Sequence, residues 1–212
     1  MSSKTQIIPL VTSSIPRQEI NSCLDCGCGF GKWASILRTH LANMASAQIV
    51  GIDIFPENLK FCQKYGAYDS LILADIRQLP FKNDSFDVVL AGEVIEHISK
   101  KKGEEFLANI EKLSKSRVII TTPNGSWPDN PIVYKDGKIN LNEEHKSMWH
   151  VSDFSERGYN VHAIGLKTSS TFHSALIQQV IDGLDFMLFP AWFIPQVGKH
   201  LVAYKDKTDQ KH

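Results

Sequence analysis

The stretch Cys23-Leu24-Asp25-Cys26-Gly27-Cys28-Gly29-Phe30-Gly31-Lys32-Trp33 decides the fold. It combines a short apolar run, an acidic residue near its end, three glycines at every second position and the start of an amphipathic segment. This order is typical of a buried strand that turns tightly into a helix, because glycine allows backbone conformations and close approaches that a side chain would block. Such a turn normally lies against a ligand. We therefore predict that Gly27, Gly29 and Gly31 contact a cofactor.

The ligand of this turn is predicted to be a nucleoside cofactor without phosphates. The dinucleotide fingerprint Gly-x-Gly-x-x-Gly delivers a pyrophosphate to the helix N-terminus, whereas here the third glycine comes one position early. Asp25 is expected at the mouth of the turn, where its carboxylate would repel phosphate. That acid suits a cofactor with an ammonium group, such as the methionine part of S-adenosylmethionine. A flavin or nicotinamide domain with an altered turn is the alternative interpretation.

Strands and helices alternate along the rest of the chain, which predicts an α/β fold with a doubly wound, mostly parallel sheet. Strands are expected at 22–26, 47–53, 70–74, 86–92, 117–122, 159–164 and 199–204, and helices at 30–44, 56–65 and 101–114. The length of 212 residues and the hydrophobic content of 42% predict one domain over 1–212, with 1–20 as a loose N-terminal lead-in that holds at most one short helix. Residues 123–150 and 166–196 are expected as insertions on the substrate side of the sheet.

Composition narrows the class of partner. The chain carries 23 basic and 23 acidic residues, so no global electrostatic field would recruit nucleic acid or an anionic membrane. Cys23, Cys26 and Cys28 fall on a predicted buried strand and its turn, where their side chains diverge, so we expect reduced, buried thiols and no metal on them. The N-terminal residues lack the apolar core of a signal peptide, which predicts a cytoplasmic protein.

Four motifs in sequential order resemble the class I S-adenosylmethionine-dependent methyltransferases. They are Leu24-Asp25-Cys26-Gly27-Cys28-Gly29-Phe30-Gly31, Gly51-Ile52-Asp53, Ala74-Asp75-Ile76 and Phe86-Asp87-Val88-Val89-Leu90-Ala91-Gly92-Glu93. The resemblance covers residues 20–125 strongly and 145–206 more weakly. It implies a Rossmann-like sheet of seven strands whose last strand is antiparallel, and S-adenosyl-L-methionine as the cofactor.

The resemblance also assigns the cofactor-binding residues. Asp53 would accept hydrogen bonds from both ribose hydroxyls, a demand that an amide would meet poorly. Asp75 would take the adenine amino group while Ile76 packs on the ring. The full set is Asp25, Gly27, Gly29, Gly31, Asp53, Ile54, Asp75, Ile76 and Glu93, in which Asp25 and the glycine turn would hold the methionine part.

The acceptor side of the site is predicted to carry the catalytic residues Glu93, His97, His145 and His150. Either His145 or His150 could remove the proton of an acceptor hydroxyl near neutral pH. Both lie in a polar loop, where a surface histidine without a catalytic role is the alternative. Ser152 is expected to cap the helix that begins nearby.

The same region offers an alternative metal set, Glu93, Glu96, His97 and His145, with His150 as a substitute for His145. That grouping resembles the metal-dependent 2′-O-methyltransferases of small-RNA 3′ ends and the ubiquinone-pathway O-methyltransferases. However, Glu-x-x-Glu-His after the fourth strand also occurs in family members without a metal. The favoured interpretation therefore uses no metal.

The predicted reaction is O-methylation of a small molecule or glycan. A metal-dependent RNA 3′-end 2′-O-methyltransferase is the first alternative, although neutral charge argues against a large nucleic-acid footprint. A non-catalytic methyltransferase-fold partner subunit is the second. The aromatic segment 184–195 is too short and proline-broken to span a bilayer. It is expected to be core, or to contact an apolar acceptor, a lipid carrier, a membrane surface or a second subunit in a homodimer.

Overall fold

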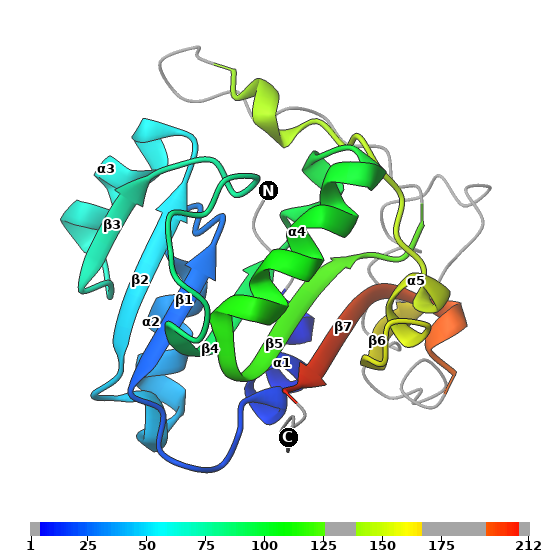
Figure 1. The fold of residues 1–212 in the computed structure, drawn as a ribbon, viewed down its shortest axis with the longest axis horizontal. Helices are drawn as coiled ribbons and strands as arrows, with labels where there is room; N and C mark the ends of the chain where they lie inside the picture. Colours follow the sequence, from blue (N-terminus) through cyan, green and yellow to red (C-terminus); the bar gives the residue numbers. More distant parts are fainter. Residues whose placement is uncertain (1–4, 126–138, 167–193, 208–212) are drawn as a thin grey trace, which may run out of the picture.

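The structure, a computed structural model, describes residues 5–125, 139–166 and 194–207 (Figure 1). Its strands are β1 (Ser22–Cys26), β2 (Gln48–Asp53), β3 (Ser70–Leu73), β4 (Phe86–Gly92), β5 (Ser114–Pro123), β6 (Asn160–Leu166) and β7 (Gly198–Asp206). The α-helices are α1 (Ile8–Ser14), α2 (Lys32–His40), α3 (Pro56–Tyr65), α4 (Lys100–Leu113) and α5 (Val151–Ser155). Short 3₁₀ helices are η1 (Thr5–Ile7), η2 (Ala42–Met44), η3 (Ile95–His97), η4 (Leu141–Glu143) and η5 (Pro195–Val197).

The strands form one seven-stranded sheet in the order β3-β2-β1-β4-β5-β7-β6. The pairs from β3 through β5 are parallel, and β7 is antiparallel to both of its neighbours, β5 and β6. The predicted doubly wound, mostly parallel sheet with an antiparallel last strand is confirmed. Because β7 runs in the opposite direction, its first residues lie at the edge where the parallel strands end. That edge is where ligands bind in open α/β sheets.

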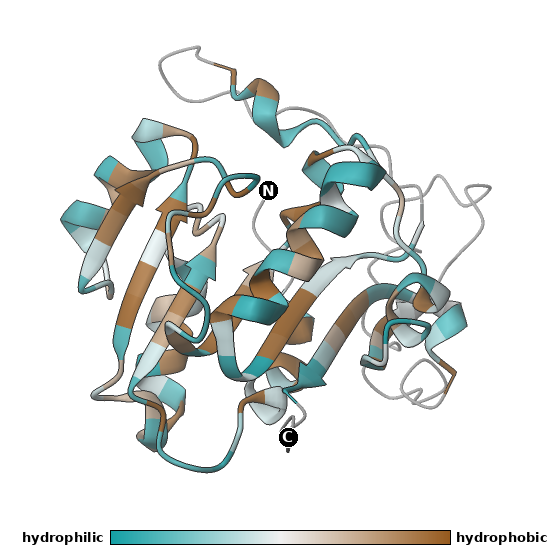
Figure 2. Cartoon of the chain, viewed as in Figure 1, coloured by the Kyte–Doolittle hydropathy of each residue, from teal (hydrophilic) through white to brown (hydrophobic). Residues whose placement is uncertain are grey.

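Helices cover both faces of this sheet (Figure 1). On one face, Phe106, Leu107 and Ile110 of α4 pack on the apolar side chains of the central strands. On the other face, α1 and α2 pack in a second core. Figure 2 shows the corresponding hydropathy, with apolar residues along the central strands and polar residues on the outward surfaces of the helices. The central strands are therefore buried on both sides, as their continuous apolar runs predict.

The N-terminal segment differs from the predicted loose lead-in. It forms η1 and α1, and the side chains of Ile7, Leu10 and Val11 are at most 2% exposed in the second core. Their spacing of three and four residues places them on one helical face, so burial of that face orders the segment. The segment therefore holds the one short helix that the prediction allows, but it is packed and not loose, because burial of the apolar face outweighs the polar residues and prolines. The helix expected at 30–44 also ends earlier, since α2 stops at His40.

Several predictions about the long insertions lie outside the described residues. Residues 126–138 and 167–193 are not described, and they contain most of the expected insertions and nearly all of the aromatic segment 184–195. Of that segment, the structure describes Ile194, which is 53% exposed, and Pro195, which begins η5. None of the helices in the described ranges is long and apolar enough to cross a membrane.

Candidate functional site

The glycine turn joins β1 to α2 through three residues in the left-handed region. Gly27, Gly29 and Gly31 have φ values of 73°, 51° and 78°. At Gly27 a Cβ atom would also lie 2.4 Å from Cγ2 of Val94, so this position needs glycine for both conformation and space. At Gly29 a Cβ atom would meet no protein atom within 4 Å. The turn thus leaves room beside its backbone for a ligand.

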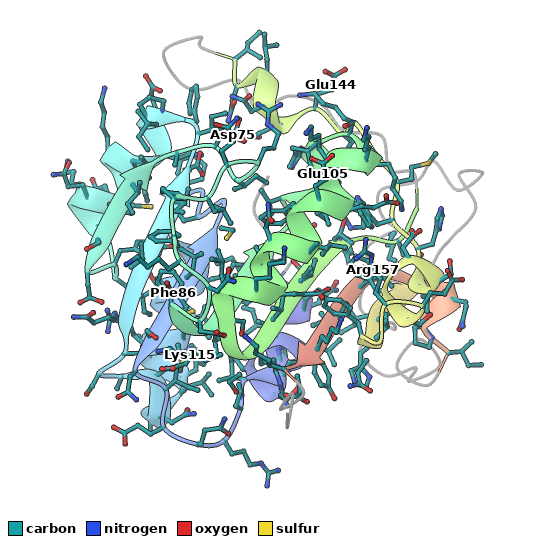
Figure 3. All side chains as sticks on the ribbon, in the orientation of Figure 1. Asp75, Phe86, Glu105, Lys115, Glu144 and Arg157 are labelled. Carbon is teal, nitrogen blue, oxygen red and sulfur yellow. The ribbon has the colours of Figure 1, made fainter. Side chains whose placement is uncertain are left out.

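A cavity of about 260 Å³ opens at the carboxyl edge of the sheet beside this turn. Its lining includes every predicted cofactor residue except Asp25 and Gly31, together with residues from the acceptor side. Figure 3 places the labelled Asp75 and Glu144 at this end of the molecule, whereas Phe86, which begins β4, lies toward the opposite end. The predicted cofactor residues are therefore brought together at one site.

Asp53 ends β2 and organises the turn. Its Oδ2 accepts hydrogen bonds from the Gly29 amide at 2.9 Å and from the Asn58 side chain at 3.2 Å, and its Oδ1 accepts from the Phe55 amide at 2.8 Å. The carboxylate also lines the cavity. Each carboxylate oxygen has lone pairs left for further donors, as the predicted contact with ribose hydroxyls requires. Asn58, which the sequence analysis did not single out, lines the cavity as well.

Asp75 follows β3 and is paired with a neighbour two residues away. The Arg77 guanidinium and amide donate to its carboxylate, with Arg77 Nε at 2.9 Å from Oδ1 and 2.8 Å from Oδ2. These hydrogen bonds hold the pKa of Asp75 below its usual range. Asp75, Ile76 and Arg77 all line the cavity. Asp75 is thus an ionised acceptor at the end predicted for adenine, and Arg77 was missed by sequence reasoning although it lies only two positions away.

Asp25 lies beneath the glycine turn, not at its mouth as predicted. Its side chain is fully buried, and Tyr68 Oη donates to its Oδ2 at 2.6 Å. Burial raises the pKa of Asp25 to about 7, against the lowering by the Tyr68 hydrogen bond and with a smaller contribution from the charge of Asp53. Asp25 is not among the residues that line the cavity. The expected placement was wrong because Asp25 lies within β1, one residue before the strand ends, where Tyr68 packs against its carboxyl group.

Glu93 occupies a strained backbone position directly after β4. Its φ is 54°, which is uncommon for a residue with a side chain, and its amide donates to the Thr121 carbonyl at 2.9 Å. Glu93 lines the cavity, as predicted. The preceding Gly92 packs against α2, since a Cβ there would lie 2.2 Å from Nε1 of Trp33. The end of β4 is therefore fixed from both sides.

Glu96 is buried behind the acceptor end of the cavity, with 2% of its surface exposed. Thr122 Oγ1 donates to its Oε2 at 3.0 Å. Burial, and next the charge of Glu93, raise the pKa of Glu96 well above its usual range. The Glu96 carbonyl accepts hydrogen bonds from the amides of Lys146 at 2.7 Å and Ser147 at 3.1 Å. Those bonds attach the loop before α5 to η3.

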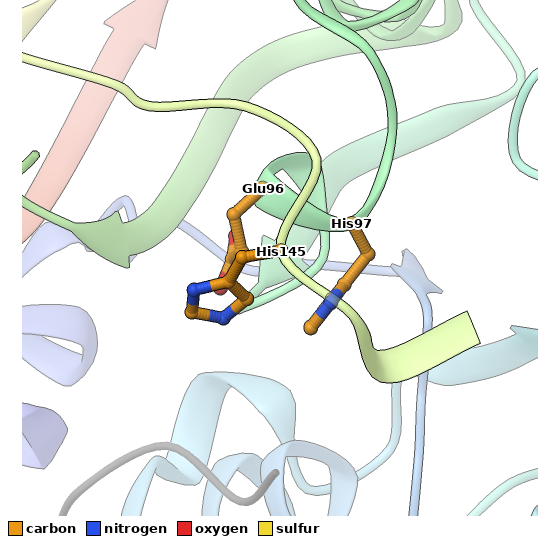
Figure 4. Close-up of side chains that lie close together, drawn as sticks. All are labelled: Glu96, His97 and His145. Atoms are coloured by element: carbon orange, nitrogen blue, oxygen red, sulfur yellow. The ribbon is translucent and has the colours of Figure 1, made fainter. Parts of the chain in front are cut away.

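This attachment brings His145 against His97 (Figure 4), with ring centroids 5.0 Å apart. Ligand atoms of Glu96, His97 and His145 lie within 4.8 Å of one another, and we call these three residues the Glu-His-His cluster. His97 Nδ1 lies 3.3 Å from the Glu144 carbonyl. Burial, followed by the neighbouring His145, lowers the pKa of His97 to about 4. Because its pKa is lowered, the His97 imidazole is neutral at neutral pH. His97 also lines the cavity, so the ring is accessible to a ligand there.

The structure differs from the predicted acceptor site at two residues, Glu93 and His150. Glu93 is not part of the Glu-His-His cluster; its Oε2 instead lies 3.6 Å from Nδ1 of His200. His150 lies at the N-terminus of α5, where its amide donates to Asp153 Oδ2 at 2.7 Å, and it lines a separate hollow. His150 is therefore a helix-capping position and not part of this cavity. Ser152, predicted to be the cap, lies inside the helix.

His200 is the main residue that sequence reasoning missed at this site. It is the third residue of β7, and it reaches the carboxyl edge because that strand is antiparallel. Lys102 and Lys146, which line the cavity, were not singled out either. A usable signal for His200 exists in the sequence, since the start of an antiparallel last strand belongs to the ligand edge of the sheet.

Comparison with known proteins agrees with this geometry. The methyltransferase domain family matches residues 24–121. An uncharacterised protein of Methanocaldococcus jannaschii is 28% identical over 138 residues, covering 65% of this chain and 54% of that protein. Ajmaline N-methyltransferase of Rauvolfia serpentina is 30% identical over 50% of this chain and 36% of its own length. The mitochondrial ubiquinone biosynthesis O-methyltransferase of Rattus norvegicus is 28% identical over 45% of this chain and 32% of its own. The chain thus spans about half, or less, of these relatives.

Solved structures share the fold over nearly the whole chain. A SAM-dependent methyltransferase from Archaeoglobus fulgidus superposes with a TM-score of 0.59 at 18% identity, covering 95% of this chain and 93% of that one. The small RNA methyltransferase HEN1 gives a TM-score of 0.58 at 18% identity, covering 97% of this chain and 25% of that one. The sheet order, the glycine turn, the acidic strand ends and the match over residues 24–121 lead to one conclusion: this chain carries a methyltransferase domain with the fold of the class I S-adenosylmethionine-dependent methyltransferases.

Proposed function

We propose that the chain transfers a methyl group from S-adenosylmethionine to a hydroxyl oxygen of a small molecule or glycan. The observation that carries this proposal is that one cavity is lined both by Asp53 and Asp75, which are predicted to bind the cofactor, and by Glu93 and His97, which are predicted to be catalytic. Ajmaline N-methyltransferase and the ubiquinone O-methyltransferase are named for small-molecule acceptors, which supports the substrate class.

In this proposal, some residues of the cavity bind the cofactor and another accepts the proton of the acceptor hydroxyl. S-adenosylmethionine, when bound, supplies an electrophilic methyl group. Asp53 and Asp75 accept hydrogen bonds from the cofactor, and the glycine turn lets the backbone approach it closely. Because a carbonyl can only accept, Nδ1 of His97 carries its proton toward Glu144 and leaves Nε2 as the proton acceptor. His97 Nε2 then takes the hydroxyl proton as the oxygen attacks, and the protein mainly orients the reactants.

A metal-assisted version of the reaction is the second candidate, supported by the Glu-His-His cluster. Its carboxylate and imidazoles are suitable ligands for a divalent cation. Oε1 of Glu96 and Oε1 of Glu93 are both buried without a hydrogen-bond partner in the described ranges, so the residues present fit a cation. The cation would act as a Lewis acid on the acceptor hydroxyl. Under this version His97 is a ligand and not a base, and an RNA 3′ end becomes an acceptor candidate.

Transfer of labelled methyl from S-adenosylmethionine into fractionated cell extract separates these candidates. The assay compares wild type, His97→Ala and a control, His162→Ala, on β6, where the ring stacks on Tyr204 away from the cavity. We expect label in the small-molecule or glycan fraction, which survives a chelator, is lost in His97→Ala and persists in the control. Label in RNA that disappears with chelator would establish the metal-assisted alternative. No label in any fraction, with no binding of S-adenosylhomocysteine, would indicate a non-catalytic partner subunit.

A further inference from the structure

The last strand of the sheet brings a histidine to the acceptor end of the site. β7 runs antiparallel to β5, so its first residues lie at the edge where β4 and β5 end. His200 stands opposite Pro123 in register, and its Nδ1 lies 3.6 Å from Oε2 of Glu93. The His200 and Glu93 side chains are only 8% and 7% exposed. The proposed reaction gives His200 no role.

Each of the two buried carboxylates has one oxygen close to a side chain from a neighbouring strand. Thr122, from β5, donates to Oε2 of Glu96, and His200, from β7, lies against Oε2 of Glu93. Oε1 of each carboxylate is buried and has no hydrogen-bond partner within the part of the chain that the structure describes. Adjacent buried carboxylates repel each other and lose solvation, and a shared cation offsets both costs. One oxygen of each carboxylate therefore faces a neighbouring strand, by a hydrogen bond in Glu96 and by a 3.6 Å approach in Glu93, and the other oxygen is left for a common ligand.

The backbone of Glu93 is fixed independently of its side chain. Its φ of 54° and the hydrogen bond from its amide to the Thr121 carbonyl set the position of Cα. A strained conformation of this kind persists only where the surrounding structure determines it. The direction of the carboxylate then depends on the side-chain torsions alone, and the His200 ring restricts them.

We propose that His200 is a positioning residue: it holds Oε2 of Glu93 so that Oε1 joins the Glu-His-His cluster in binding a divalent cation. This inference rests on the metal-assisted form of the proposed function. His200 acts through Glu93 and does not itself contact the cation. Partners that orient metal ligands in this way typically change metal affinity by about 10- to 100-fold when they are removed.

The test measures the affinity for Mn²⁺ alone as the probe, by electron paramagnetic resonance, in the presence of S-adenosylhomocysteine. The variants are His200→Ala, His200→Asn, Glu93→Gln and the double variant His200→Ala with Glu93→Gln. Asparagine places an amide nitrogen near the position of Nδ1, so it should restore the contact that alanine removes. His162→Asn is the control, because this histidine lies on the neighbouring strand β6, two register positions from the residue opposite His200.

We expect His200→Ala to weaken Mn²⁺ binding at least about tenfold, and His200→Asn to recover most of that loss. In the Glu93→Gln background the alanine change should cause no further loss, because the two residues act as one unit. Cofactor affinity should not change in the single variants His200→Ala and His200→Asn, which separates positioning from general damage to the fold. Unchanged Mn²⁺ affinity in His200→Ala, or an equal additional loss in the Glu93→Gln background, overturns the positioning role. Wild-type protein that binds no Mn²⁺ overturns both this inference and the metal-assisted function.

Discussion

At the scale of single residues, the cofactor edge of the sheet contains carboxylates in three different environments. Asp75 is ionised beside a guanidinium, Asp53 is held by three hydrogen bonds, and Asp25 is buried against a phenol. Desolvation disfavours the charged form, whereas donors and cations favour it, so the pKa of Asp25 is raised and that of Asp75 is lowered although both acids share one edge. Their roles therefore follow from their surroundings and not from residue type.

Asp25 makes stability depend on pH in a specific direction. Its pKa in the folded protein is about 7, above the ordinary value of 3.8, so the folded state holds a proton that the unfolded state has released. The contribution of Asp25 to the free energy of unfolding is largest below about pH 4. It falls by about 1.4 kcal/mol per pH unit until about pH 7. Asp25→Asn, which mimics the protonated form, should lack this decline. Chemical denaturation of both proteins at several pH values measures the difference, and parallel curves would contradict it.

Whether a site residue could be predicted from the sequence depends on which parts of the chain surround it. Asp53, Asp75 and Glu93 could be predicted because each lies at the end of a strand or within two residues of it, where a parallel sheet collects side chains at one edge. The placement of Asp25 could not, because its burial depends on Tyr68, which arrives from a later loop. The role of His150 as a helix-capping position depends equally on where the helix begins.

At the scale of elements, the glycine turn and the segment after β4 are fitted to each other. Gly27 faces Val94, whereas Gly29 faces open space although both have positive φ. The turn and the end of β4 therefore act as one packed unit that supports the cavity. The strand bounds of β1 and β4 agree with the prediction because their apolar runs are continuous, and the ends of α2 and β5 differ because fraying depends on local contacts.

Alanine substitutions at Gly27 and Gly29 should distinguish the cost of a steric clash from the cost of a positive φ. Gly27→Ala and Gly29→Ala both pay the cost of positive φ, about 1 kcal/mol. Gly27→Ala alone adds overpacking against Val94, which typically costs about 1–3 kcal/mol. We expect Gly27→Ala to have a lower melting temperature than Gly29→Ala, as measured by circular dichroism. Adding Val94→Ala to the Gly27→Ala protein should partly restore the melting temperature. Equal melting temperatures for the two alanine variants would show that the contact with Val94 is not restrictive.

At the scale of the whole molecule, the sheet is stabilised by two cores, and the N-terminal helix completes one of them. The fold class could be predicted from the alternation of apolar strands and amphipathic helices, and the antiparallel last strand from the family resemblance. The packing of α1 could not, because a seven-residue helix carries little periodic signal and its burial depends on the far face of the sheet. Tertiary burial, more than helix propensity, orders such a segment.

Truncation of Leu10 should show how much α1 contributes. Its side chain is 2% exposed in the second core, so Leu10→Ala is expected to lower the free energy of unfolding by about 2–5 kcal/mol. The control is Leu141→Ala, whose side chain is 73% exposed and whose effect should stay within about 0.5 kcal/mol. Urea denaturation measures both, and a Leu10→Ala protein as stable as the control would mean that α1 is dispensable.

Calorimetric titration with S-adenosylhomocysteine, comparing wild type with Asp53→Ala, measures whether the cavity binds the cofactor through Asp53. We expect wild type to bind the ligand and Asp53→Ala to weaken binding by roughly 1.5–3 kcal/mol for each lost charge-assisted hydrogen bond. A melting curve of the variant checks that the loss does not come from unfolding of the turn that Asp53 holds. Wild-type protein that binds no S-adenosylhomocysteine, or an unchanged dissociation constant in Asp53→Ala, would contradict the assignment of this cavity to the cofactor.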